Sequence, residues 1–309
     1  MRKKILNCIE KTARKNKKII FIGSDLGVGV LDNFKKKNPD RFFMEGVSEQ
    51  HIVGMAAGMA MEGFIPYVNT IATFLTRRCF EQNILDLGLH NSKVRLIANG
   101  GGYVYAPLGP THLAFEDLAI MRTIPNMTIF CPADSNEIQQ LFDLSINHEG
   151  PIYFRLAKGF DEIVTSLKAK YQIGKGILYG KHGDFLVCTT GITLQMALKA
   201  KSILETMGIP ISIFHSHTIK PFDEKQFIGL TKKFNNIITI EEHSCIGGLA
   251  SICSEIIVQK NLKFKGIFKS IALPDSFPIG YGSQNSLLEK YGISCDYLVK
   301  SVQSIYEKK

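Results

Sequence analysis

The sequence predicts an α/β protein built from two doubly wound domains, each with a mostly parallel sheet. Short apolar runs of strand length alternate with amphipathic stretches of helical length in both halves of the chain. Between residues 161 and 183 the apolar density falls, and glycines at 174, 176 and 183 interrupt the pattern. A chain of 309 residues is long enough for two domains. We therefore expect domains at 1–165 and 184–309, with 166–183 as the connection.

The first half carries most of the strand candidates. They are short and apolar throughout, as strands buried on both faces usually are. The expected strands are 19–22, 42–44, 65–68, 94–98, 127–131 and 152–155. The expected helices are 1–16, 48–62, 75–89, 115–122 and 135–147. The second half repeats the alternation on a smaller scale, with strands at 185–189, 211–214, 237–240 and 267–272 and helices at 193–207 and 247–260.

Composition narrows the class of protein. The chain is 45% hydrophobic and 21% charged, as soluble globular proteins are, and no apolar run approaches the length of a membrane span. The net charge is +9, but the basic clusters at 11–18 and 35–37 lack interleaved aromatics, which favours a solvated face over nucleic-acid binding. Seven scattered cysteines without a Cys-x-x-Cys pair predict reduced thiols in a cytoplasmic protein.

The stretch 46–60 combines one acid with a run of small residues. Glu49 precedes a segment in which Gly, Ala and Met fill almost every position. At helical spacing, Glu49, Val53 and Ala57 share a face, and Gly54 and Gly58 form a second, flat patch. We therefore expect a buried helix in close contact with another helix. From this stretch alone, Glu49 either caps its own helix or provides a buried acid for chemistry.

Other candidate residues follow the predicted strands. Ser24 and Asp25 come directly after the first strand, at the edge where open α/β sheets place ligands, although a plain turn explains them equally well. Phe74 lies among aliphatic residues, so core packing is its simplest role. His215 and His217 could share one face of a strand, but no third ligand has suitable spacing, so we predict no metal site.

Several segments together resemble one enzyme family. The sequence Gly-Val-Ser-Glu-Gln-His at 46–51 resembles the pyrimidine-binding domain of thiamine diphosphate enzymes of the transketolase type. The strongest match is Gly-Pro-Thr-His at 109–112, continued by the segments 116–119, 121–127 and 132–134 at family spacing. The resemblance extends from Phe21 to the C-terminus and includes, more distantly, deoxyxylulose-phosphate synthases.

The resemblance implies roles for individual residues. The glutamate matching Glu49 hydrogen-bonds a ring nitrogen of the cofactor's aminopyrimidine, and the matching phenylalanine, Phe74, stacks on that ring. Arg77 resembles a cofactor-site arginine of deoxyxylulose-phosphate synthases. His112 contacts the donor substrate, and Arg155 is expected to bind the acceptor's phosphate, a role that suits its planar donor fork. Ser24 and Asp25 are expected on the substrate side of the same site.

Two departures from the family pattern are informative. Leu108 replaces the acidic residue that usually precedes Gly-Pro-Thr-His and contacts a substrate hydroxyl, which leaves the donor sugar open. The chain has no Gly-Asp-Gly motif, which in full-length transketolases belongs to the domain that holds Mg²⁺ and the diphosphate. We therefore expect the C-terminal subunit of a split transketolase. Its partner would be an N-terminal subunit that holds most of the Mg²⁺ site, in a heterotetramer acting on sugars or sugar phosphates.

Two other functions remain open from the sequence. The beta subunit of a 2-oxo acid dehydrogenase shares both domains and the Glu-Gln pair, but Gly-Pro-Thr-His and the segment 121–127 favour a transketolase. A non-catalytic partner subunit with a decayed site gains some support from Leu108, whereas Glu49, Phe74 and His112 argue against it. A nucleic-acid-binding module would rest on charge alone.

Overall fold

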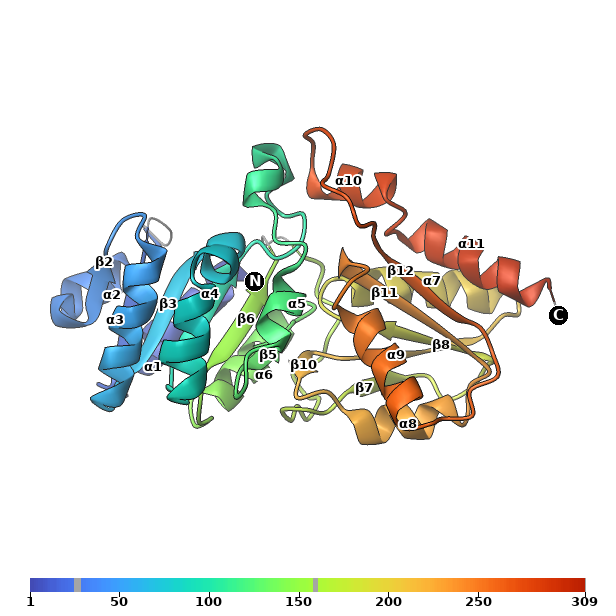
Figure 1. Cartoon of the computed structure of the whole chain (residues 1–309), viewed down its shortest axis with the longest axis horizontal. Helices are drawn as coiled ribbons and strands as arrows, with labels where there is room; N and C mark the ends of the chain where they lie inside the picture. The colour runs from blue at the N-terminus through green and yellow to red at the C-terminus, as the bar shows by residue number, and fades with distance from the viewer. Residues whose placement is uncertain (25–28, 158–160, 309) are drawn as a thin grey trace.

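A computed structural model describes residues 1–24, 29–157 and 161–308 as two α/β units side by side (Figure 1). The strands are β1 (Ile19–Gly23), β2 (Phe42–Met44), β3 (Ile65–Ile71), β4 (Arg95–Asn99), β5 (Thr128–Phe130), β6 (Ile152–Leu156), β7 (Ile177–Tyr179), β8 (Phe185–Thr189), β9 (Ile211–His215), β10 (Thr218–Lys220), β11 (Asn236–Ser244) and β12 (Phe268–Leu273). The helices are α1 (Arg2–Ala13), α2 (Asp32–Lys37), α3 (Glu49–Met61), α4 (Phe80–Gln82), α5 (Asp117–Arg122), α6 (Ser135–Ser145), α7 (Thr193–Thr206), α8 (Glu224–Thr231), α9 (Leu249–Gln259), α10 (Gln284–Lys290) and α11 (Cys295–Tyr306).

The first unit confirms the predicted α/β class. Its seven-stranded sheet has the order β10-β5-β6-β4-β3-β1-β2, and the six strands from the first half of the chain all run parallel. The seventh strand, β10, comes from the second half and pairs antiparallel with β5. The chain leaves β1 toward β2 on one side and returns to β3 on the other, so the strand order reverses between β1 and β3. In open α/β sheets, ligands bind at such a reversal, beyond the carboxyl ends of the strands.

The second sheet begins earlier than we expected. Its order is β12-β11-β8-β9-β7, with β7 antiparallel to β9 and the other strands parallel. Strand β7 falls within residues 166–183, which we expected to be only a connection. Its three residues are half-buried and gain their strand form by pairing with β9, which local apolar density does not reveal. Strand β11 also continues to Ser244, beyond the predicted end at residue 240.

The segment 74–89 is helical, as predicted, but it is not one regular α-helix. Wide π-helical turns at Phe74–Arg78 and Asn83–Leu89 flank the short helix α4. The buried Asn83 side chain donates to the carbonyl of Leu75 at 2.7 Å, and such an inserted side chain interrupts the regular ladder. Helix α3 packs closely on this segment, since a Cβ placed on Gly54 would lie 3.7 Å from the Asp86 carboxylate. The predicted close helix–helix contact is thus present.

Other expectations concern the whole chain. All seven cysteines are free, as the sequence predicted. Within the described ranges, no helix combines the length and apolarity needed to cross a membrane. Nor do those ranges contain a group of three or more His, Cys, Asp or Glu side chains that could hold a metal ion. His215 instead pairs with Glu137, at 3.1 Å.

The Asp134 carboxylate joins the end of the first unit to helix α6. It caps the helix by accepting from the amides of Asn136 and Glu137 at 2.8 and 3.0 Å. It also accepts from the amides of Val164 and Thr165 and from the Thr165 hydroxyl, each at 2.7 Å. Burial alone would raise the pKa of Asp134, but these hydrogen bonds stabilise the charged form and hold the pKa below its ordinary value.

Replacing Asp134 by alanine should destabilise the fold strongly. The substitution removes a helix cap and leaves buried amide donors of two segments without acceptors, so we expect a loss of about 3 kcal/mol in the free energy of unfolding. Urea unfolding followed by circular dichroism measures it. Asp143→Ala, at an exposed position of the same helix, is the control and should stay within about 0.5 kcal/mol of the parent. A loss under about 1 kcal/mol for Asp134→Ala would show that other contacts hold this junction.

His217 provides a pH-dependent test of the junction between the two units. It lies fully buried before β10, with its ring centroid 5.0 Å from that of Tyr171, and burial lowers the pKa of His217 to about 4. The unfolded chain takes up this proton near the ordinary His pKa, so His217 makes stability fall as the pH drops from about 6.5 to about 4.

In His217→Gln the loss in the free energy of unfolding between pH 7 and pH 4.5 should be smaller by about 2 kcal/mol than in the parent, as urea unfolding at each pH measures. His90→Gln, at an exposed position, should leave the pH profile unchanged, and an equal slope in His217→Gln and the parent would contradict this assignment.

Candidate active site

A buried polar cluster lies where the first sheet reverses its strand order. Ser24 follows β1, and its hydroxyl oxygen is 2.6 Å from that of Thr70 in the neighbouring strand β3. One strand further, the Asn99 amide donates to the Asn69 side chain at 2.9 Å and to the carbonyl of Thr70 at 3.1 Å. Ser24 is therefore at the predicted edge of the sheet. Asp25, the other substrate residue expected there, lies outside the described residues.

Glu49 is a buried acid, as the sequence predicted. It occupies the first turn of α3, whose small residues allow the helix to pack tightly, with Val53 and Ala57 in the core. Only 1% of Glu49 is exposed. Its carboxylate accepts from Nη1 of Arg78 at 2.5 Å, so the charge is paired across two elements and does not cap its own helix.

Phe74 and His112 meet beside this ion pair. Their ring centroids are 5.3 Å apart in an edge-to-face arrangement, which joins the 74–78 turn to the Gly-Pro-Thr-His loop. The guanidinium carbon of Arg78 lies 4.4 Å from the centroid of Phe74. Nδ1 of His112 is 2.9 Å from the Thr111 hydroxyl, and Nε2 has no hydrogen-bond partner among the described side chains. Glu49, Phe74 and His112 therefore lie close together around Arg78, and the roles that the resemblance implies for them stay predictions.

Arg78 is the arginine that contacts Glu49 and Phe74 in this chain, whereas the expected cofactor-site arginine, Arg77, has other partners and its role stays a prediction. Arg77 pairs with Glu116, donates to the carbonyl of Leu113 at 3.0 Å and lies 5.6 Å from the ring centroid of Phe115. Neighbouring residues of a helical turn point to different sides, so a shift of one position separates the two arginines. The signal that could have identified Arg78 was its spacing of four from Phe74, which places the two on one helical face.

The nearby thiol is not a candidate nucleophile. Cys79 follows Arg78 and is fully buried. Burial raises the pKa of Cys79 to about 12, and the Glu49 carboxylate adds to the rise. Because the thiolate is the reactive form of cysteine, this side chain stays inert at neutral pH.

Arg155 is held by other parts of the chain. Its Nε and Nη2 donate to the Asp117 carboxylate at 2.8 and 3.0 Å, and Nη2 also reaches the carbonyl of Glu242 at 2.8 Å. Burial alone would lower the pKa of Arg155, but Asp117 raises it above its ordinary value. The same carboxylate accepts from the Tyr153 hydroxyl at 2.8 Å. This geometry gives Arg155 a structural role within the chain, and the phosphate-binding role that the resemblance implies stays a prediction.

A second buried acid, Glu242, also has a structural environment. Its carboxylate accepts from the amide of Tyr103 at 2.7 Å and from the Gln284 side chain at 2.8 Å. Burial raises the pKa of Glu242 to about 7. Its stretch, 241–243, resembles the family's C-terminal domain, where we expect a mostly structural role, and its bonds join the loop after β4 to helix α10.

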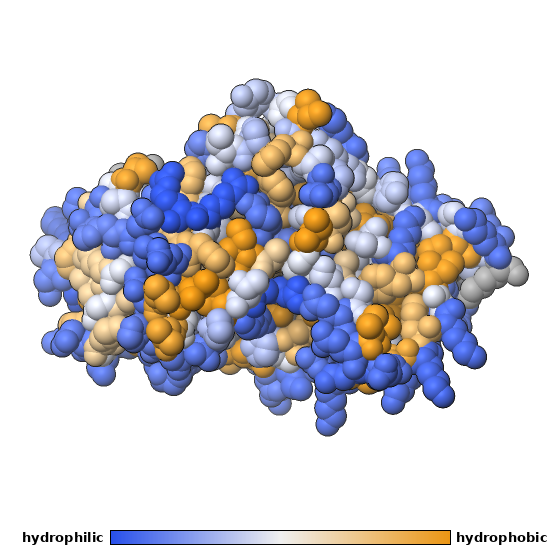
Figure 2. All heavy atoms as spheres, viewed as in Figure 1, coloured by the Kyte–Doolittle hydropathy of each residue, from blue (hydrophilic) through white to orange (hydrophobic). Residues whose placement is uncertain are grey.

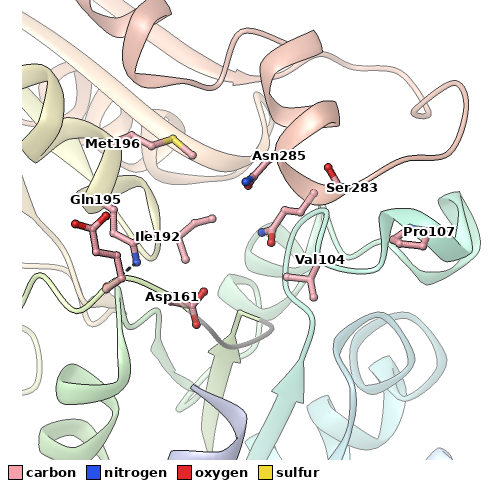
Figure 3. A pocket seen from close by; sticks show the side chains of 10 residues that line it. Val104, Pro107, Asp161, Ile192, Gln195, Met196, Ser283 and Asn285 are labelled. Atoms are coloured by element: carbon pink, nitrogen blue, oxygen red, sulfur yellow. Dashed lines mark hydrogen bonds between the residues drawn. The ribbon is translucent and has the colours of Figure 1, made fainter.

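Two cavities lie away from Glu49. One, of about 510 Å³, is lined by Arg77, Phe115, Glu116, Asp275, Ser276 and Phe277. The other, of about 470 Å³, lies between helix α7, helix α10 and the 104–107 turn, and Figure 3 shows Gln195 and Met196 facing Ser283 and Asn285 across it. Neither cavity is lined by Glu49, Phe74 or His112.

Comparisons with known proteins agree with this geometry. The family model "Transketolase, pyrimidine binding domain" matches residues 1–160, and "Transketolase, C-terminal domain" matches residues 174–298. The chain is 30% identical over 304 residues to the 6-deoxy-6-sulfo-D-fructose transketolase subunit SqwH of Clostridium sp. (strain MSTE9), covering 96% of this chain and 91% of that one. It is 32% identical over 313 residues to a putative transketolase C-terminal section of Methanocaldococcus jannaschii, covering 100% and 96%.

A solved structure extends the likeness to the whole fold. It is described as "Split gene transketolase, inactive beta4 tetramer" and superposes with a TM-score of 0.89 at 30% identity, covering 98% of this chain and 97% of that one. Two family models in the expected order, relatives of matching length and this superposition all agree. The chain belongs to the transketolase family.

Proposed function

We propose that this chain is the C-terminal subunit of a split, thiamine diphosphate-dependent transketolase. The enzyme transfers a two-carbon ketol unit from a ketose donor to an aldose acceptor. The observation that carries the proposal is the meeting of the buried acid Glu49 with Phe74 and His112 at one edge of the sheet. Relatives of nearly the same length that are named as a transketolase subunit and as a C-terminal section support the split form.

The residues present fit the pyrimidine half of thiamine diphosphate. The carboxylate of Glu49 and the face of Phe74 already accommodate a planar cationic group, the Arg78 guanidinium. An aminopyrimidine offers the same combination of flat shape and hydrogen-bond donors. The described residues include no metal-binding group, so we assign Mg²⁺ and the diphosphate to the partner subunit. When bound, thiamine diphosphate supplies the carbanion chemistry that breaks and forms the carbon–carbon bond.

The side chains of this chain then have separate tasks. Glu49 accepts a hydrogen bond from the pyrimidine nitrogen and holds the proton there, in a position shielded from water. Phe74 fixes the plane of the ring by stacking. His112, with Nδ1 next to the Thr111 hydroxyl, presents Nε2 to the oxygens of the sugar donor. The roles of Ser24, Asp25 and Arg77 in substrate or cofactor binding stay predictions.

The position of Leu108 leaves the donor ketose open: either the donor lacks the hydroxyl that the usual acidic residue contacts, or another group contacts that hydroxyl. Leu108 is 51% exposed next to the Gly-Pro-Thr-His loop. At this position most family members carry an acidic residue that contacts a hydroxyl of the substrate. One relative is named for 6-deoxy-6-sulfo-D-fructose, a ketose with a modified end. A donor screen for this enzyme should therefore compare fructose 6-phosphate, xylulose 5-phosphate and 6-deoxy-6-sulfofructose.

The partner subunit has a matching surface to bind. Figure 2 shows apolar residues gathered over α3 and the 74–89 segment, where Met61, Phe80, Leu85 and Leu89 are exposed. We had expected the Gly54/Ala57 face of α3 at this interface, but Ala57 is buried within its own chain. We propose a heterotetramer of two chain types joined over the exposed patch. The unpaired thiols support placing it in the cytoplasm.

Glu49→Gln tests the central residue. Glutamine keeps the size of the side chain but cannot hold the proton on the pyrimidine, so we expect the rate of ketol transfer to fall about 100-fold or more. The variant is reconstituted with the N-terminal subunit, and size-exclusion chromatography checks that the complex still assembles. Glu10→Gln on the remote helix α1 should keep the parent rate. Undiminished turnover by Glu49→Gln would remove this residue from the mechanism.

The split form has its own test. The purified chain alone should show no measurable ketol transfer and should bind thiamine diphosphate at least about ten-fold more weakly than the two-subunit complex, because the contacts to the diphosphate are missing. Calorimetric titration and a coupled assay of glyceraldehyde 3-phosphate release measure both. Turnover by the isolated chain at the rate of the complex would show that no second subunit is needed. Pyruvate-dependent acetylation of a lipoyl domain would instead indicate a 2-oxo acid dehydrogenase.

A further inference from the structure

We propose that the Arg78 side chain occupies the aminopyrimidine site in the free chain and must change its conformation when the cofactor binds. The inference rests on the proposed function and adds a regulatory contact to it. A guanidinium and an aminopyrimidine are both flat, and both carry hydrogen-bond donors in the plane of the group. Arg78 can therefore satisfy the same two neighbours as the cofactor ring.

The geometry of Arg78 matches that role on two sides at once. Nη1 of Arg78 is 2.5 Å from Oε2 of Glu49. In the proposed function the carboxylate of Glu49 accepts a hydrogen bond from the pyrimidine nitrogen instead. The guanidinium carbon is 4.4 Å from the ring centroid of Phe74, the face assigned to stacking. A ring held by Glu49 and stacked on Phe74 would need the space that this guanidinium fills.

The burial of the two partners is unequal, and this shows which one moves. The Glu49 side chain is 2% exposed, whereas the Arg78 side chain is 41% exposed. The carboxylate is held in the first turn of α3, while the Arg78 side chain is already partly in contact with water, so Arg78 is the partner that would move. Arg78 thus covers the side from which a ligand reaches Glu49.

An exchange follows from the cost of leaving a buried carboxylate unpaired. Arg78 keeps Glu49 charge-paired and in position until a ligand offers an equivalent donor. Binding then replaces one ion pair and one cation–π contact by one hydrogen bond and one stacked ring. The free energy needed to release Arg78 lowers the observed affinity for the cofactor.

The test is the affinity of the reconstituted two-subunit complex for thiamine diphosphate with Mg²⁺, measured by calorimetric titration. Arg78→Ala should lower Kd at least five-fold, since nothing has to be displaced. Arg78→Lys keeps a charge but not the flat group, and it should lower Kd by a smaller factor. Arg14→Ala, which removes an exposed arginine paired with Glu10 on α1, should leave Kd unchanged. An unchanged or raised Kd in both Arg78 variants overturns the inference and leaves the proposed function in place.

A second measurement needs only the purified chain. Because Arg78→Ala leaves Glu49 buried without its partner, its unfolding midpoint in urea should fall, and adding Glu49→Gln should restore most of the loss. Equal losses in the single and double variants would show that the pair is not coupled and would overturn the inference. If the parent complex binds no thiamine diphosphate, the proposed function fails, and the inference fails with it.

Discussion

A carboxylate removed from water needs a partner, and the first unit is arranged around that requirement at Glu49. The small residues of α3 let the helix pack closely against the sheet, which buries Glu49 in the first turn of the helix. The irregular helical segment beginning at Phe74 then supplies both a cation and an aromatic face at the same point. π-Helical turns are frequent at functional sites because they reorient side chains that a regular helix would point elsewhere.

The rest of the buried charge holds the two units together. Arg155 and Asp117 form a fully enclosed pair whose remaining donors bind backbone carbonyls of both units. Asp134 fixes the segment that leaves the first unit. The Arg155 guanidinium also donates to the carbonyl of Ala114, two residues after His112.

The residues that could be predicted from the sequence stand in distinctive motifs. Glu49, Phe74 and His112 belong to motifs that resemble the family, and it was the resemblance that implied they lie close together. Arg77 was singled out because it matches an arginine of deoxyxylulose-phosphate synthases, and nothing in the linear motif shows that its neighbour Arg78 pairs with Glu49. Arg155 was expected at the substrate through the resemblance, and its pairing with Asp117, 38 residues away, could not be inferred from the sequence. Strands β7 and β10 could not be predicted either, because each pairs with a strand that is distant in the sequence.

Strand β10 also decides how independent the two halves can be. It covers β5, which would otherwise end the first sheet with a row of unsatisfied backbone groups. Uncovered edges of this kind recruit strands from other molecules and lead to aggregation. Strand β10 therefore protects the first unit from self-association during folding. A polypeptide truncated after the first unit would expose β5 as an unpaired, aggregation-prone edge strand.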